Sequence, residues 1–262
     1  MISIITFIWA FFQALNPVIL NGEIVLLDRY EYLILEEDKD IKFQEIIERN
    51  DFTKIDQQSK NFGINNDVVW LKYVVENNSE KEGKYFYINN SSLDSLELFV
   101  VSENEILESY VGGRLVDFYS KPILSKSIIF DINLPIGKTS EIFLKVKSVN
   151  KKIITSTITN RNYLENLINR ENILFGIFTG VIVGLFFYNL FLFFSVRDKL
   201  YLIYVIHTVL VWFAQSSILG FTQEIFWPNV VWLNLRSGVI FSSLVSIVGI
   251  WFLRVFLSTD KF

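Results

Sequence analysis

A run of apolar residues from 172 to 196, NILFGIFTGVIVGLFFYNLFLFFSV, constrains this chain more than any other feature. It is long enough for a helix across the roughly 30 Å hydrocarbon core of a bilayer. Residues 200–220 and 237–257 form two further apolar runs of about that length. We therefore predict a membrane region of three transmembrane helices over residues 172–257.

The charged residues are concentrated in residues 23–170, before this region. The whole chain is 51% hydrophobic and 16% aromatic, more apolar than an ordinary soluble chain. This asymmetry indicates one soluble domain followed by a membrane region, with membrane lipid as a partner. Residues 1–22 carry a short apolar run that is typical of a signal peptide or an N-terminal anchor, and either would export the domain. The basic turn at Arg197 and Lys199 would then be cytoplasmic.

Residues 23–160 have the pattern of an all-β domain. Segments that mostly alternate between apolar and polar residues are separated by turn signals such as Asn77-Asn78-Ser79 and Pro135-Ile136-Gly137. Residues 40–49 fit one short helix or turn. About seven strands in this length predict an antiparallel sandwich. The predicted strands are residues 32–35, 70–76, 85–88, 95–101, 127–133, 142–147 and 153–159.

Several classes of function are excluded by the residue types. The chain has no cysteine and one histidine, so it has no disulfides, thiolate nucleophiles or multi-histidine metal centre. That histidine, His207, lies in a predicted span, so the exported domain has no base for a Ser-His triad. A net charge of −4 gives no reason to expect a nucleic-acid partner. We expect neither an enzyme nor a bound cofactor or metal.

Trp70 is the most conspicuous candidate for ligand binding. Strand alternation puts it on one face with Lys72 and Glu76, opposite a row of core residues. An indole plate flanked by polar groups can hold a small ligand. The alternative is a second small core covered by a loop such as residues 111–121, with Lys72 lying over the indole. Arg114, which follows Gly112-Gly113 and could form a bidentate hydrogen bond, is added to the predicted site, with Tyr87 and Asp117 as weaker candidates.

The predicted spans contain residues suited to helix packing. Gly176, Gly180 and Gly184 are spaced by four, which leaves a smooth groove on one helix face. That face would pack within the same bundle or form a homodimer. Asn189 and His207 are expected to make interhelical hydrogen bonds; a functional role for His207 is the alternative.

Ordered motifs along the chain resemble a known receptor family. They are Phe62-Gly63, Trp70-Leu71-Lys72, LDSLELFV at 93–100, FDINLPIGKTSEIFLKVKS at 130–148, FYNLFLFFSVRDKLYLIYVIH at 187–207 and FLRVFL at 252–257. This set resembles the bacterial seven-transmembrane receptors with diverse intracellular signalling modules (7TMR-DISM), through their type 2 extracellular sensor and the start of their membrane domain.

The resemblance implies a multi-pass receptor of the bacterial inner membrane. Its sensor would be a jelly-roll-like sandwich on the periplasmic side that binds a small-molecule or glycan ligand. The family's four further spans and its output signalling module are missing from this sequence. Residues 161–171 would be the linker that couples the sandwich to the helices. The alternative function is a membrane-anchored, non-signalling binding protein derived from such a receptor by truncation.

Overall fold

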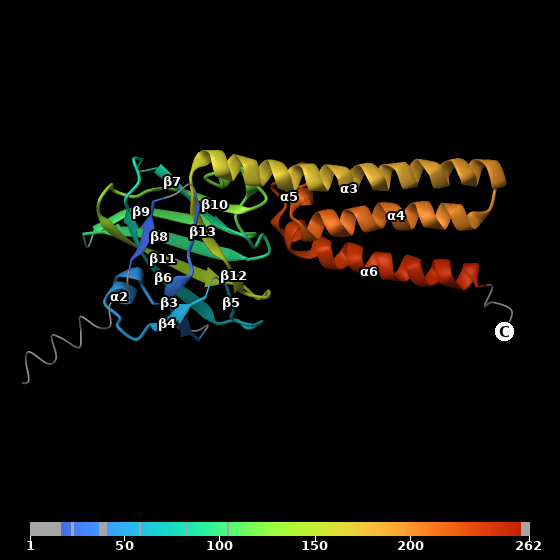
Figure 1. The fold of residues 1–262 in the computed structure, drawn as a ribbon. Helices are drawn as coiled ribbons and strands as arrows, with labels where there is room; N and C mark the ends of the chain where they lie inside the picture. The colour runs from blue at the N-terminus through green and yellow to red at the C-terminus, as the bar shows by residue number, and fades with distance from the viewer. Residues whose placement is uncertain are drawn as a thin grey trace, which may run out of the picture. The chain divides into compact units, whose positions relative to one another are not determined.

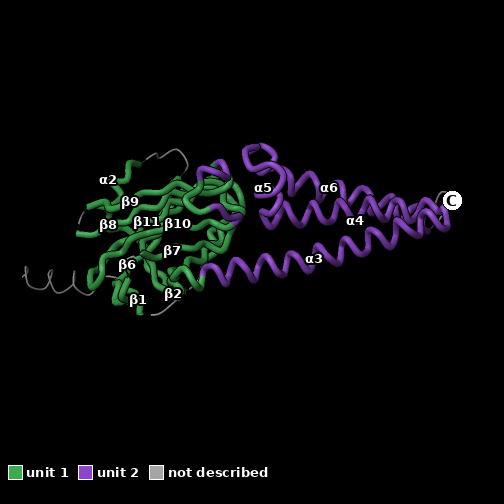
Figure 2. Tube along the Cα trace, turned by 90° about the horizontal axis from the view of Figure 1, so that it is seen from above, with its two compact units in different colours: residues 1–116, 121–123, 127–163 green, residues 117–120, 124–126, 164–262 purple. Residues whose placement is uncertain are grey.

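The computed structural model describes residues 17–257, except 22–23, 37–40, 58, 82 and 104. Most of the predicted signal peptide or anchor lies outside the described residues. The chain divides into two compact units (Figure 2). Unit 1 comprises residues up to 116, 121–123 and 127–163, and unit 2 comprises residues 117–120, 124–126 and those from 164 onward.

The larger sheet of unit 1 has seven strands (Figure 1). They are β1 (Val18–Leu20), β3 (Arg29–Leu35), β4 (Thr53–Asp56), β6 (Val68–Asn77), β8 (Ser95–Ser102), β9 (Glu105–Gly112) and β11 (Thr139–Lys147). The order is β4-β3-β6-β11-β8-β9, all antiparallel, with β1 pairing in parallel with the end of β6. Alternation makes the inner face of this sheet aliphatic: Leu71, Leu98 and Leu144 are all fully buried.

A smaller sheet covers this inner face. Its strands are β2 (Ile24–Leu26), β7 (Gly83–Ile88), β10 (Ile128–Asn133) and β13 (Ser156–Thr159), in the order β10-β7-β13-β2. A separate pair joins β5 (Lys60–Asn61) to β12 (Ile153–Ile154). The predicted antiparallel sandwich is confirmed, although the sequence pattern did not reveal β9 and the short strands β1, β2, β4 and β5.

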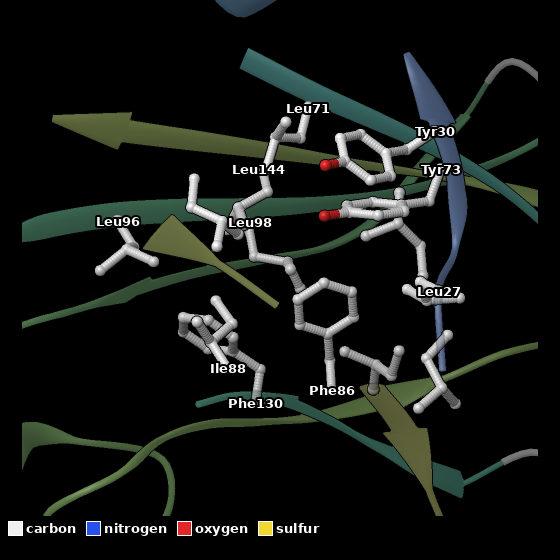
Figure 3. Close-up of a cluster of buried hydrophobic side chains, with 14 of the residues drawn as sticks. Leu27, Tyr30, Leu71, Tyr73, Phe86, Ile88, Leu96, Leu98, Phe130 and Leu144 are labelled. Carbon is white, nitrogen blue, oxygen red and sulfur yellow. The ribbon is translucent and has the colours of Figure 1, made fainter. Parts of the chain in front are cut away.

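The core lies between the two sheets (Figure 3). Phe86, Ile88 and Phe130 of the smaller sheet pack towards the leucines of the larger one. Burial of each such side chain stabilises the fold by about 1.5–3 kcal/mol. The hydroxyl groups of Tyr73 and Ser156 lie 2.9 Å apart and link the sheets through a buried hydrogen bond.

Unit 2 is helical. Its elements are α3 (Arg161–Val196), whose first three residues belong to unit 1, the 3-10 turn η1 (Phe118–Ser120), α4 (Lys199–Ile218), α5 (Phe221–Ile225) and α6 (Val231–Phe256). Three of these, α3, α4 and α6, are long and apolar enough to span a membrane. Asp198 caps α4 by accepting a hydrogen bond from the Leu200 backbone N–H at 2.9 Å. α6 begins before residue 237, the expected start of the third span, so Trp232 and Arg236 are helical.

Contacts between the helices are largely aromatic. The rings of Phe175 on α3 and Phe221 on α5 stack at 3.7 Å. Trp212 on α4 donates its indole N–H to the Thr179 hydroxyl on α3 at 3.0 Å. These contacts hold α3 against the end of α4, where a hydrogen bond in an apolar setting fixes the register of the two helices.

Candidate ligand site

Trp70 lies in a second hydrophobic core on the outer face of the larger sheet. Its side chain is 2% exposed. The short helix α2 (Phe43–Ile47) covers it: the ring of Phe43 stacks on Trp70 at 5.9 Å and on Phe99 at 3.9 Å. The indole therefore has no face open to a ligand in this structure. The cover comes from residues around α2, not from residues 111–121 as the alternative suggested.

The charged neighbours of Trp70 are engaged with other residues. Lys72 forms an ion pair with Glu141 at 2.7 Å and lies over the ring of Phe143. Lys145, not Lys72, lies over the Trp70 indole, 5.8 Å from its centre. Glu76 is half-buried farther along β6. The outer face of the larger sheet around Trp70 is therefore a covered hydrophobic core, and ion pairs lie at its edge.

The other predicted site residues lie elsewhere. Tyr87 is buried on the smaller sheet and donates its hydroxyl to Asn89 at 3.3 Å. The Arg114 backbone N–H bonds the Leu93 carbonyl at 2.9 Å, and burial lowers the pKa of its guanidinium while nearby Asp94 opposes that shift. Asp117 is exposed at η1, in unit 2. Tyr87 and Trp70 therefore lie on different sheets, and Asp117 belongs to the other unit.

A different, polar pocket lies in unit 1, where β7 begins and β10 ends. Its volume is about 750 Å³, within the roughly 300–1,000 Å³ usual for small-molecule sites. It is lined by Asn21, Asn78, Ser79, Glu80, Lys81, Gly83, Lys84, Tyr85, Asp131, Asn133, Asn160, Arg161 and Asn162. Carboxylate, amide, hydroxyl, ammonium and guanidinium groups thus surround one aromatic ring. We call this the polar pocket.

Strand pairing places the aromatic and acidic side chains of the polar pocket. Tyr85 on β7 pairs with Asp131 on β10 and with Thr159 on β13. Alternation turns Phe86 into the core and leaves Tyr85 on the opposite face, half-buried. Directly opposed residues stand about 5 Å apart on one face. The tyrosine ring and the Asp131 carboxylate are therefore neighbours.

The β6–β7 turn forms another wall. Asn77 ends β6 fully buried and donates its amide N–H groups to the carbonyls of Leu134 at 2.7 Å and Lys81 at 3.0 Å. Its side-chain oxygen accepts from the backbone and the hydroxyl of Ser79. These bonds satisfy a buried amide completely and fix the turn that carries Asn78, Ser79 and Lys81.

The first residues of α3 form the third wall. Asn160 caps this helix by accepting a hydrogen bond from the Tyr163 backbone N–H at 2.9 Å. Arg161 and Asn162 follow as exposed residues of the first turn. α3 continues unbroken to Val196, so the predicted linker, residues 161–171, is helical and runs directly into the first apolar span.

Two groups of the polar pocket have shifted pKa values. Burial lowers the pKa of the Lys84 ammonium, and the nearby charge of Lys81 lowers it further. Desolvation raises the pKa of the Asp131 carboxyl, and Glu108 adds to this while Arg161 opposes it. Each charged form is thus disfavoured by its surroundings, and such shifts are common at functional sites.

Sequence reasoning missed this pocket, although part of its signal was visible. Alternation along β10 already marks Asp131 and Asn133 as an outer polar row, and the Asn77-Asn78-Ser79 turn is rich in side chains that bond hydroxyls. Their pairing with Tyr85 and their closeness to Arg161 depend on contacts distant in sequence. The pattern of one strand cannot reveal such contacts.

Comparison with known proteins establishes the family. A model described as 7TMR-DISM extracellular 2 matches residues 28–159, and one described as 7TM diverse intracellular signalling matches residues 171–262. The chain belongs to the 7TMR-DISM family. This is a family of sensory receptors and not of enzymes, and its membrane domain agrees with three apolar helices in making the protein integral to a membrane. No curated protein matches the chain.

Solved structures resemble this 7TMR-DISM chain only weakly. The β-glucuronidase of Faecalibacterium prausnitzii is 12% identical with a TM-score of 0.31, over 51% of this chain and 22% of the enzyme. The epithelial adhesin 6 A domain of Candida glabrata, in complex with Galb1-3GlcNAc, is 10% identical with a TM-score of 0.26, over 56% of this chain and 84% of the adhesin. The chain thus spans about a fifth of that glucuronidase, and TM-scores this low carry no argument.

Within the 7TM part, the glycine face is unpacked in the described helices. A Cβ built on Gly176, Gly180 or Gly184 would meet nothing within 4 Å. The described bundle therefore does not use this face for its own packing. Homodimerisation through it stays a prediction.

Asn189 and His207, the two residues predicted to make interhelical hydrogen bonds in the spans, have different contacts. His207 packs against α6, where a Cβ on Gly249 would lie 3.5 Å from its Nε2 atom. Asn189 corrects our expectation: its amide donates to the Leu185 carbonyl at 2.8 Å, within its own helix, instead of to a neighbouring helix. The preceding turn is the nearest acceptor for a short side chain in an apolar helix.

Unit 2 has an apolar hollow of about 370 Å³ at the end of the spans. Leu174, Phe175 and Phe178 of α3 line it together with Leu219 and Phe221. An ion pair at 2.7 Å between Lys126 and Glu171 forms its polar edge. The hollow offers few groups that could orient a hydrophilic ligand, so the polar pocket is the better candidate.

Proposed function

We propose that this 7TMR-DISM chain is a sensory receptor that binds a small, carbohydrate-like ligand in the polar pocket. One observation carries the proposal: the pocket is lined by the first residues of α3, the helix that continues into the first membrane span. A ligand held there contacts the sandwich and the transmembrane helix at once.

The chemistry of the lining supports a hydrophilic ligand. The pocket has one aromatic face, Tyr85, for the C–H face of a sugar ring. Five asparagines, a serine and five charged side chains offer donors and acceptors for hydroxyl groups in fixed directions. An apolar ligand would leave these groups desolvated and unpaired, at a cost of about 1–3 kcal/mol each.

Transmission follows from the continuity of α3. Ligand binding can shift the equilibrium between two positions of α3 only by the difference between the ligand's binding free energies in those two positions. Contacts to Asn160, Arg161 and Asn162 are the ones that change when the helix moves against the sandwich strands. We place the sandwich on the periplasmic side of a bacterial inner membrane, with Arg197 and Lys199 in the cytoplasm.

The test uses the full chain in lipid nanodiscs on a glycan array. Asn162→Trp fills the polar pocket from an exposed helix position. Asn166→Trp adds the same indole one turn farther along α3, outside the pocket lining, and is the matched control. We expect the first variant to lose at least about tenfold in affinity, the equivalent of 1.4 kcal/mol, and the control to bind as wild type.

Equal binding by Asn162→Trp and wild type would contradict the proposed site. Binding that never alters α3 would instead favour the second candidate, a membrane-anchored binding protein without signalling. A fluorophore at the end of α3 separates these outcomes, because only the receptor would change its emission when ligand is added.

A further inference from the structure

Lys84 is a buried cation for which the described part of the chain supplies no partner. It lines the polar pocket, its side chain is 6% exposed, and it makes no hydrogen bond or ion pair with any described residue of the chain. Alternation places it in line with Phe86 and Ile88, opposite Ile132 on β10. A desolvated charge is costly unless it is paired, so this position favours an anion from outside the protein.

Other groups around the pocket add to the positive potential. The charge of Lys81 acts directly on Lys84. Arg161 lies in the first turn of α3, and the N-terminus of this long helix carries a partial positive charge. Backbone N–H groups at such a terminus bind carboxylate and phosphate groups readily. Lys81, Arg161 and the start of α3 therefore add positive potential to a pocket that also contains the carboxylates of Glu80 and Asp131.

Side chains that accept hydrogen bonds also line the polar pocket, near Lys81, Lys84 and Arg161. Asp131 stands on the opposite face of the strand pair from Lys84, next to Tyr85. Both faces reach the pocket because it lies at the ends of these strands. Asn133 is held by Glu108, which accepts its backbone N–H at 3.0 Å and its amide at 2.7 Å. Hydroxyl groups of a ligand can donate to Asp131 while an acidic group meets the lysines.

We infer that the ligand of the polar pocket is an acidic saccharide, with its anionic group at Lys84 and Lys81 and its hydroxyls at Asp131 and the asparagines. This inference rests on the proposed function, because it specifies the ligand class for the same pocket. A carboxylate, a sulfate or a phosphate ester supplies the same chemistry.

Matched pairs of glycans test the inference. The full chain in nanodiscs is titrated with glucuronate-terminated, sulfated and phosphorylated oligosaccharides, each beside its neutral glucose-terminated counterpart. We expect at least one acidic member to bind about tenfold or more tightly than its neutral partner, since hydrogen bonds to charged groups are worth about 1.5–3 kcal/mol. The affinity for that acidic oligosaccharide falls as the salt concentration rises. Comparison of the three acidic oligosaccharides shows whether the bound group is a carboxylate, a sulfate or a phosphate.

Lys84→Met removes the ammonium and keeps a side chain of similar length. We expect it to lose the preference for the acidic glycan, to bind the neutral counterpart as wild type does, and to melt no lower than wild type. Lys147→Met, at an exposed end of β11 outside the pocket, is the control and keeps the preference.

Each other outcome is also decisive. Equal binding of acidic and neutral glycans by wild type overturns the inference and leaves the proposed function standing. An acidic preference that persists in Lys84→Met also overturns it. If wild type binds none of the glycans, both the inference and the carbohydrate-like ligand of the proposed function fail.

Discussion

At the scale of single residues, Tyr85 and Trp70 both lie on outer faces of the sandwich, with different surroundings. Trp70 is enclosed by Phe43, Phe99 and Phe143. Tyr85 is half-buried among asparagines and charged groups. An aromatic side chain on an outer face binds a ligand only where no other element covers it, so Tyr85 is the better ring for stacking.

Trp70→Ala tests the second core. Removing a buried indole leaves a cavity under α2, and we expect a loss of about 3–5 kcal/mol in the free energy of unfolding. Chemical denaturation of the sandwich in the full chain measures it. Lys72→Ala, which removes only an ion pair at the rim, should cost no more than about 1 kcal/mol. A Trp70→Ala protein that melts within a few degrees of wild type but binds no glycan would restore Trp70 as a ligand plate.

Asp131→Asn tests the electrostatics of the polar pocket. The pKa of this carboxyl is raised in the folded protein, mainly by desolvation. The folded state therefore binds the proton more tightly than the unfolded state, and stability falls as pH rises from the ordinary carboxyl pKa through the raised one. The melting temperature of wild type should drop over this interval relative to Asp131→Asn. If the melting temperatures of the two proteins change with pH in the same way, the raised pKa of Asp131 is contradicted. Asp117→Asn is the control for the loss of a surface carboxylate.

At the scale of elements, α3 joins the polar pocket to the first membrane span in one helix. The cap at Asn160 fixes where the helix begins. Its side chains at residues 161 and 162 are exposed to the pocket, and its apolar face begins about two turns later. A rigid helix transmits a displacement along its axis, whereas a flexible linker would absorb it.

Two glycines inserted after Asn166 should therefore separate binding from transmission. The chain has no cysteine, so Val196→Cys gives a single labelling site at the end of α3. We expect a ligand-dependent change in fluorophore emission that disappears in the insertion variant, while affinity stays within about threefold of wild type because the pocket residues are unchanged. An emission change that survives the insertion would show that α3 is not the route.

Thr179→Val tests the contact between α3 and α4. It removes the acceptor for the Trp212 indole, and we expect a loss of roughly 0.6–2 kcal/mol in membrane unfolding assays. Thr208→Val is the matched control, because that hydroxyl donates to the Tyr204 carbonyl within α4. Equal losses in both variants would mean that the interhelical bond adds nothing specific.

Particular elements explain which parts of the fold were predictable. The core strands β6, β8, β10 and β11 mostly alternate, so their faces followed from the sequence. The sequence pattern did not predict β9, because most of its residues are exposed and apolar residues hardly alternate with polar ones along it. The predicted span starts later than α6, which begins at Val231, because the polar residues Asn234 and Arg236 interrupt the apolar run at its start. The cover over Trp70 and the polar pocket depend on pairings between distant segments, which no local pattern contains.

At the scale of the whole molecule, a charged sandwich and an apolar helical unit each have their own packing. The family models follow the same division, with the extracellular model ending at residue 159 and the membrane model beginning at residue 171. The first turns of α3 connect the region matched by the extracellular model to the region matched by the membrane model. The central claim is that ligand binds where this connection starts.

Hydrogen–deuterium exchange of the full chain in nanodiscs, with and without a glycan that the array identifies, tests this claim most directly. The account predicts slower exchange in residues 78–81, 83–85 and 160–163 when the glycan is bound, and unchanged exchange in residues 41–52 over Trp70. Protection confined to residues 41–52 and 68–76 would contradict it and move the site to the second core.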